Sequence, residues 1–237
     1  MQSSAFVIAV FEFVVLLFSL SVHECAHAWM ASRLGDQTAR MVGRVSLNPM
    51  VHVDPIGTLL FPALMIFGPL IGFSFFGGML VGWAKPTPVN TRNFSRIVRD
   101  DNLVTLAGPV SNLLLVGVAF AVLAVIAIVT PNGRMVVLTS FLAALSPQTD
   151  FTPQPVVLLC TLAILINLSL CIFNLLPIPP LDGSHVMRNI LPYNAVRVYD
   201  RIPIWVSYLF MIFIGGAVIR ALLQPALEIV LWGLSRV

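Results

Sequence analysis

Two histidines and a glutamate stand close together in the stretch His23-Glu24-Cys25-Ala26-His27. Residues four apart lie on one face of an α-helix, so both imidazoles could reach the same metal ion. Glu24 lies beside them, where a carboxylate could take a proton from an attacking water molecule. This spacing is typical of zinc metalloproteases, in which the histidines bind the metal and the glutamate is the general base. The motif therefore predicts metal-assisted peptide hydrolysis.

A catalytic zinc site needs a third protein ligand and an open position. The other histidines and the nearby acidic residues supply the candidates: Glu12, His52, Asp54, Asp182 and His185. Asp182 is the strongest, because it follows the prolines of the stretch NLLPIPPLDG (174–183), which must terminate the preceding helix. Backbone that is not helical at membrane depth usually lines a cavity. The alternative is that Asp182 only forms a turn with the following glycine.

The motif lies in an unusually apolar chain. Of its 237 residues, 58% are hydrophobic and 10% are charged, and the mean hydropathy is +0.96. Soluble domains carry about 25% charged residues, so the composition predicts a membrane protein that crosses the bilayer several times. The net charge of +3 gives no basic surface for nucleic acid, and the three cysteines all lie in apolar segments, which argues against a disulfide framework.

Ionisable side chains inside a membrane helix are costly and usually face a cavity or a partner. Three of them within one turn of the first apolar run are therefore expected to be functional. The alternative is a helix end at the membrane interface, where His23 and His27 would reach out to water.

Five apolar runs must position these residues, at about 5–33, 55–80, 103–130, 155–178 and 203–233. They predict an all-α membrane protein with about five to six transmembrane helices. A single intramembrane domain would cover residues 1–237, with its core motifs in 19–186 and one or more C-terminal membrane helices in 203–233.

Two parts of the chain do not fit simple helices or loops. The run 55–80 is interrupted by Pro62, Gly68, Pro69, Gly72, Gly77 and Gly78, which predicts a broken or re-entrant segment. The stretches 38–49 and 79–90 are rich in Val and Thr and predict short membrane-associated β-strands near the active site. An exposed strand edge could pair with a peptide.

Basic residues mark the orientation. Three loops hold most of them: Arg33, Arg40 and Arg44; Lys85, Arg92, Arg96 and Arg99; Arg188, Arg197 and Arg201. The loop 131–154 has only Arg134. The positive-inside rule places the three richer loops in the cytoplasm, so 55–80 must cross an even number of times or dip and return. This predicts a multi-pass protein of the cell (inner or plasma) membrane, with its active site towards the cytoplasm.

Five sequence elements together carry a family resemblance: HECAH (23–27), SLNPMVHVDPIGT (46–58), GWAKPTPVN (82–90), LAGPVSN (106–112) and NLLPIPPLDGSHV (174–186). On these elements the chain resembles the site-2 protease (M50) family of intramembrane zinc metalloproteases. It is most similar to the short prokaryotic form without a PDZ domain. The elements occur in family order and cover most of the chain.

The resemblance implies that His23, His27 and Asp182 bind one Zn²⁺ ion and that Glu24 is the catalytic base. It implies that Asn174 lies near the active site, where its amide could bind the substrate backbone or the developing oxyanion. Asn112 is implied to pack nearby. The alternatives are a helix cap for Asn174 and interhelical hydrogen bonding for Asn112.

His52 has two interpretations. It could lie near the zinc and support the substrate or the transition state, or it could hold the turn before Asp54 and Pro55, which we favour. The resemblance suggests single-span transmembrane proteins or remnant signal peptides in the lipid bilayer as substrates, with no nucleic acid as partner. It gives no oligomeric state. A membrane metal-ion transporter using the same His/Asp site is the alternative function, although it would leave Glu24 without a task.

Overall fold

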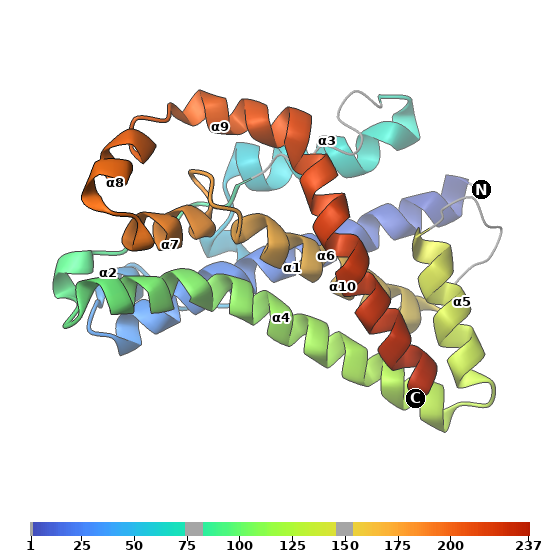
Figure 1. The fold of residues 1–237 in the computed structure, drawn as a ribbon. Helices are drawn as coiled ribbons and strands as arrows, with labels where there is room; N and C mark the ends of the chain where they lie inside the picture. Colours follow the sequence, from blue (N-terminus) through green and yellow to red (C-terminus); the bar gives the residue numbers. More distant parts are fainter. Residues whose placement is uncertain (1, 74–82, 146–153) are drawn as a thin grey trace.

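The computed structural model describes residues 2–73, 83–145 and 154–237 (Figure 1). All regular structure in these residues is helical. The α-helices are α1 (Gln2–Arg33), α2 (Thr38–Met41), α3 (Phe61–Phe67), α4 (Ile97–Val129), α5 (Gly133–Leu145), α6 (Pro155–Asn174), α7 (Asp182–Ile190), α8 (Tyr193–Tyr199), α9 (Ile204–Phe210) and α10 (Gly216–Arg236).

Four helical segments of the described chain are long and apolar enough to cross a membrane: Ala5–Arg33, Ile97–Val129, Pro155–Asn174 and Ile204–Arg236. The expected count was five to six. The two further apolar helices, Pro55–Ile71 and Gly133–Leu145, are shorter. At about 1.5 Å per residue, the 13 residues of α5 extend about 20 Å, whereas the hydrocarbon core is about 30 Å thick. The chain is thus a multi-pass helical membrane protein, with four candidate spans in its described part.

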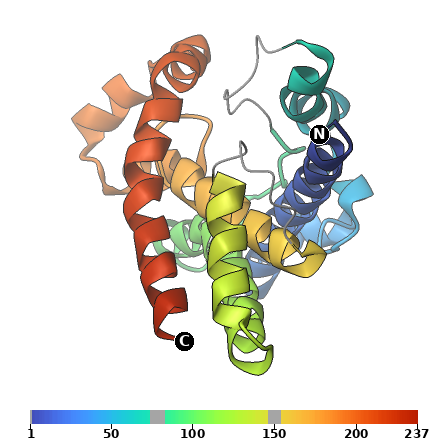
Figure 2. The ribbon, with the colours of Figure 1, turned by 90° about the vertical axis from the view of Figure 1, so that its right-hand side faces the viewer.

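The centre of the molecule is formed by α1, α4 and α6, which pack against one another along their lengths. At one end, α5 and α10 lie side by side and close this bundle (Figure 2). Their side chains join a buried cluster that includes Leu123, Phe141, Ile164 and Leu234. The stretch 131–154, which the sequence suggested was a loop, thus contributes a helix to the core.

The segment after His52 leaves the bundle and comes back to the same place. It begins with a π-helical turn (Pro55–Leu60), and α3 then packs on α1, where the Phe67 ring lies 6.0 Å from that of Phe6. On return, the Trp83 N–H donates to the Gly57 carbonyl (3.2 Å) and the Lys85 N–H donates to the His52 carbonyl (2.9 Å). The two ends therefore meet, which agrees with a segment that dips and returns.

The predicted β-strands are not found in the described residues. Within 38–49, Thr38–Met41 is helical, and 83–90 is extended but forms no strand; residues 79–82 lie outside the described part. The local preference of Val and Thr is overridden by two features. The Asp36 carboxylate accepts from the N–H and the hydroxyl of Thr38, the first residue of α2, and holds a turn there. Pro86 and Pro88 have no N–H to donate to a ladder.

Asp36 also fixes the end of the extended segment. Its buried carboxylate accepts hydrogen bonds from the Asn90 N–H (2.7 Å) and from the Asn93 amide (2.7 Å). Burial by itself raises the pKa of Asp36, but the hydrogen bonds from Thr38, Asn90 and Asn93 outweigh it and hold the pKa below its ordinary value. The loop after α1 and the segment 83–93 are therefore joined through one ionised side chain.

The three basic loops lie at one end of the molecule. Figure 1 shows α2, α7, α8 and the beginning of α4 together at one end, and α5 and the C-terminus at the other. Arg44 Nη1 donates to the Lys85 carbonyl (3.1 Å), and the Asn189 amide donates to Asp101 (2.7 Å). This arrangement agrees with the charge pattern that predicted a common side for these loops.

Candidate active site

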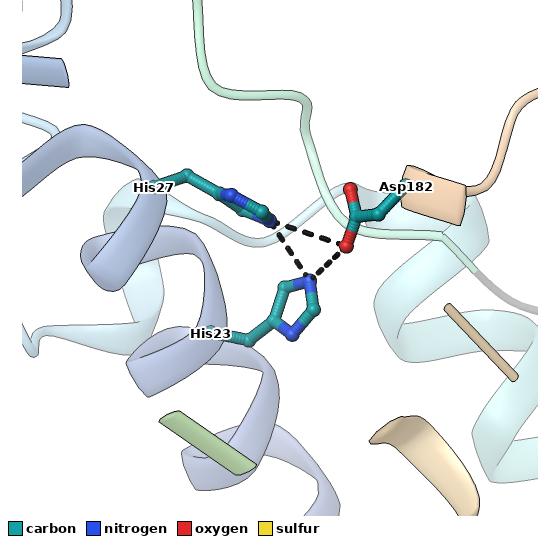
Figure 3. A group of neighbouring side chains, drawn as sticks. All are labelled: His23, His27 and Asp182. Atoms are coloured by element: carbon teal, nitrogen blue, oxygen red, sulfur yellow. Dashed lines mark hydrogen bonds and ion pairs between the residues drawn. The ribbon is translucent and has the colours of Figure 1, made fainter. Parts of the chain in front are cut away.

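Two helices bring together, at this end, three side chains that could hold a metal ion. His23 and His27 point from the same face of α1 and are buried, with 4% and 8% of their surface exposed. Asp182 is the first residue of α7. The two Nε2 atoms lie 3.0 Å apart, and Asp182 Oδ2 lies 3.1 Å from that of His23 and 3.4 Å from that of His27 (Figure 3). In the described part of the chain, this is the group of His, Cys, Asp and Glu side chains that could hold a metal ion.

The surroundings of His27 fix which of its nitrogens carries the proton. Its Nδ1 lies 2.7 Å from the backbone carbonyl of Val104 on α4. A carbonyl can only accept a hydrogen bond, so Nδ1 must donate. In the neutral ring, Nε2 then presents its lone pair to His23 and Asp182.

A longer series of hydrogen bonds fixes the protonated nitrogen of His23 in the same way. The Asn167 amide donates to the carbonyl of Ala163 (2.8 Å), which fixes its orientation, and to Ser19 Oγ (2.9 Å). Asn167 Oδ1 therefore accepts from the Asn112 amide (2.8 Å). That leaves Asn112 Oδ1 to accept from His23 Nδ1 (2.7 Å). With Nδ1 donating, His23 also presents its Nε2 lone pair.

Three hydrogen-bond acceptors thus face one another: two imidazole nitrogens and a carboxylate oxygen. Oδ2 of Asp182 is buried and has no ordinary hydrogen-bond partner among the described residues. Such a group is stable only around a cation. In a tetrahedral zinc site with bonds of about 2.0–2.1 Å, neighbouring ligand atoms lie about 3.3 Å apart. The distances between the three atoms fit that geometry.

Gly108 lets α4 approach the two histidines. A Cβ atom at this position would overlap with His27 Nε2 and with the ring of His23. The position is buried, in the middle of α4, where a glycine costs helix stability. The absence of a side chain at Gly108 therefore makes room for the two imidazole rings.

Glu24 lies next to these groups and touches the extended segment 83–90. The Thr87 hydroxyl donates to Glu24 Oε2 (2.7 Å) and approaches the Glu24 carbonyl (3.3 Å). In Figure 3 this segment runs as a pale green trace past His27 and Asp182. The carboxylate next to the metal site is thus held by a residue of the segment that was expected to receive substrate.

The other predicted site residues lie outside the group of three. Asn174 ends α6, and its amide donates to the carbonyl of Leu170 in its own helix (3.0 Å). His52 is buried, and its Nε2 lies 2.8 Å from the Ser46 carbonyl. This contact stabilises the loop whose His52 carbonyl accepts from the Lys85 N–H. His185 is not part of the metal-binding group.

Two residues of the site were missed by reading the sequence. Asn167 is a polar side chain in the middle of an apolar helix, which is itself a signal of a buried partner. Thr87 stands between two prolines and has no such signal. Its contact with Glu24 depends on the packing of two distant segments.

We expect Asn112→Ala to weaken zinc binding by about 10–100-fold, because His23 Nδ1 loses the acceptor that orients the ring. Zinc affinity is measured by competition with a chelator of known affinity. Asn174→Ala is the matched control and should bind zinc as wild type does. Asn112→Asp keeps an acceptor for His23 and should retain most of the affinity. Wild-type affinity in Asn112→Ala would contradict the orienting role.

A membrane-embedded His–His–Asp group with a glutamate beside it defines the class of this protein as a membrane metallopeptidase. The chain belongs to Peptidase family M50, whose sequence profile matches residues 11–217. The metal-ion transporter considered as an alternative finds no support in this membership.

Two of the similar proteins carry names that assign them, provisionally, as zinc metalloproteases. YwhC of Bacillus subtilis (strain 168) is 36% identical over 76% of this chain and 68% of its own length. Rip2 of Mycolicibacterium smegmatis is 28% identical over 91% of this chain and 70% of its own length. No solved structure matches the chain.

Proposed function

We propose that His23, His27 and Asp182 hold one zinc ion and that Glu24 is the base with which this intramembrane zinc metalloprotease hydrolyses peptide bonds in or near transmembrane segments. The observation that carries the proposal is the convergence of three acceptor atoms beside Glu24, two of them on a candidate membrane helix. Loss of hydrolysis in Glu24→Gln, with zinc retained, is the test.

When bound, the zinc ion supplies a Lewis acid for the scissile carbonyl and lowers the pKa of the attacking water towards about 7. Glu24 accepts the proton of that water and donates it to the leaving amine. Asn112 and the Val104 carbonyl keep the two imidazoles turned towards the metal. Burial of both histidines keeps bulk water away from them.

The segment 83–90 is suited to hold the substrate in extended form. The backbone N–H groups of Trp83 and Lys85 donate to the carbonyls of Gly57 and His52. Between them, Ala84 has no hydrogen bond to any described residue, which leaves its N–H and C=O for a substrate backbone. A substrate helix must unwind before attack, and an extended partner satisfies its freed backbone groups. We therefore infer single-span membrane proteins or remnant signal peptides in the bilayer as substrates.

We expect Thr87→Val to lower kcat about tenfold with little change in KM, because Glu24 loses a charge-assisted hydrogen bond that holds its carboxylate. Valine keeps the shape and the backbone of the segment. Thr87→Ser retains the hydroxyl and should stay close to wild type. An equal loss in both variants would show that the hydroxyl is not what matters.

We further propose that residues 1–237 form one intramembrane domain in the cell membrane, with the site end in the cytoplasm. In a variant without Cys25, Cys160 and Cys171, single cysteines are introduced as Arg92→Cys or Arg134→Cys. We expect them to react with an impermeant maleimide from opposite sides of the membrane. Arg92 belongs to a basic loop at the site end, and Arg134 lies at the other end of α4. Labelling of both from one side would contradict the proposed orientation.

A further inference from the structure

A polar hollow lies near the end of α1 that carries His23 and His27. It has a volume of about 400 Å³ and is lined by Trp29, Ser32, Arg33, Arg40 and Val45. Trp29 follows His27 by two residues, so it points to a nearly opposite face of the helix. The hollow is therefore separate from the proposed active site.

Two guanidinium groups line this hollow without an acidic partner. No residue in its lining is acidic, and the ion pairs among the described residues involve Asp182 and Asp200 but neither of these arginines. Arg33 lies 5.4 Å from the centre of the Trp29 ring, which holds it over an aromatic face. Two uncompensated cations at the wall of one hollow favour an anion with several oxygens.

The surface next to the hollow is apolar. Met41 and Met50 are 78% and 76% exposed, and Val42 and Leu47 are also exposed. They belong to the same loop region as Arg40 and Val45. An exposed apolar group of this kind marks a contact with a membrane or a partner. Trp29 is 47% exposed in the last turns of a candidate span, where tryptophan typically marks the bilayer interface.

We propose that this hollow binds the headgroup of an anionic phospholipid, of the phosphatidylglycerol class. Arg33 and Arg40 hold the phosphate, and the Trp29 ring covers the glycerol part. Met41, Val42, Leu47 and Met50 lie among the upper acyl chains. The two arginines would bind the phosphate, and the exposed apolar loop would contact the acyl chains. A phospholipid therefore fits both features, whereas a free anion fits only the arginines.

The test is native mass spectrometry of the full chain, released from nanodiscs of phosphatidylcholine containing phosphatidylglycerol. We expect wild type to retain phosphatidylglycerol, and Arg33→Gln/Arg40→Gln to bind it at least about tenfold more weakly. Arg236→Gln is the matched control, because Arg236 also lies 5.4 Å from the ring centre of a tryptophan four residues earlier at a helix end. It should retain the lipid as wild type does. Arg33→Lys/Arg40→Lys keeps the charge and should retain part of the binding.

Two results would overturn the proposal. One is equal retention of phosphatidylglycerol by wild type and the Arg33→Gln/Arg40→Gln variant. The other is displacement of the lipid by millimolar inorganic phosphate, which would identify a site for a free anion. Circular dichroism of each variant in the same nanodiscs separates loss of binding from loss of fold.

Discussion

Replacing Glu24 by glutamine should lower the rate of peptide hydrolysis by a factor of about 10²–10⁴, while the zinc content of the protein stays at that of wild type. Glutamine has nearly the same shape as glutamate but cannot accept the proton of the attacking water. The three metal-binding side chains are untouched by the change. Hydrolysis is measured with purified protein in vesicles and a panel of single-span substrates, and zinc by elemental analysis.

Glu228→Gln provides the matched control for this experiment. Glu228 is an exposed carboxylate on α10, with Gln224 as its hydrogen-bond partner, and it is remote from the metal site in the sequence. The control should cleave at the wild-type rate. Cleavage by Glu24→Gln at that same rate would rule out Glu24 as the base, whereas loss of zinc from it would mean that Glu24 helps to hold the metal.

Gly108→Ala should reduce zinc affinity by more than about 100-fold and abolish hydrolysis, although the chain still folds. The added methyl group would overlap with His27 Nε2 and the ring of His23. The rings or α4 must then move, and movement of an orienting partner alone costs about 10–100-fold in metal affinity. The helix itself gains about 1 kcal/mol of intrinsic propensity from alanine, so loss of function cannot be ascribed to a weaker helix.

Gly117→Ala on the same helix separates the steric clash from the change in helix propensity. A Cβ at Gly117 would meet nothing within 4 Å, so this variant gains the same propensity without a clash. It should bind zinc and cleave substrate as wild type does. A Gly108→Ala protein that bound zinc as tightly as Gly117→Ala would show that α4 does not limit the space at the metal.

The core of the site could be predicted from the sequence because its geometry is mostly local. A spacing of four residues puts His23 and His27 on one helix face wherever that helix lies. The proline-broken stretch before Asp182 marked a place where backbone leaves a helix inside the membrane. These two signals are independent of how the other helices pack.

The parts of the site that could not be predicted depend on contacts between segments that are distant in the sequence. Thr87 meets Glu24, and Asn167 meets Asn112, only after the helices have packed. The strands expected in 38–49 and 79–90 followed from residue preferences, which the turn at Asp36 and the prolines override in the described part. The run 55–80 is apolar along its length, but its described part, 55–73, forms only short helices. The described residues therefore hold four candidate spans and do not confirm the expected five to six.

The hydrogen-bonded chain from Ser19 through Asn167 and Asn112 to His23 makes the proposed metal site depend on the packing of the helices. Each hydrogen bond joins two of the three helices α1, α4 and α6, and its direction is set by a backbone carbonyl of α6. A chain in which α4 or α6 is not yet in place has no acceptor to turn His23 towards the metal. If these residues hold the metal as proposed, a molecule in which α4 or α6 is out of place could not cleave its neighbours.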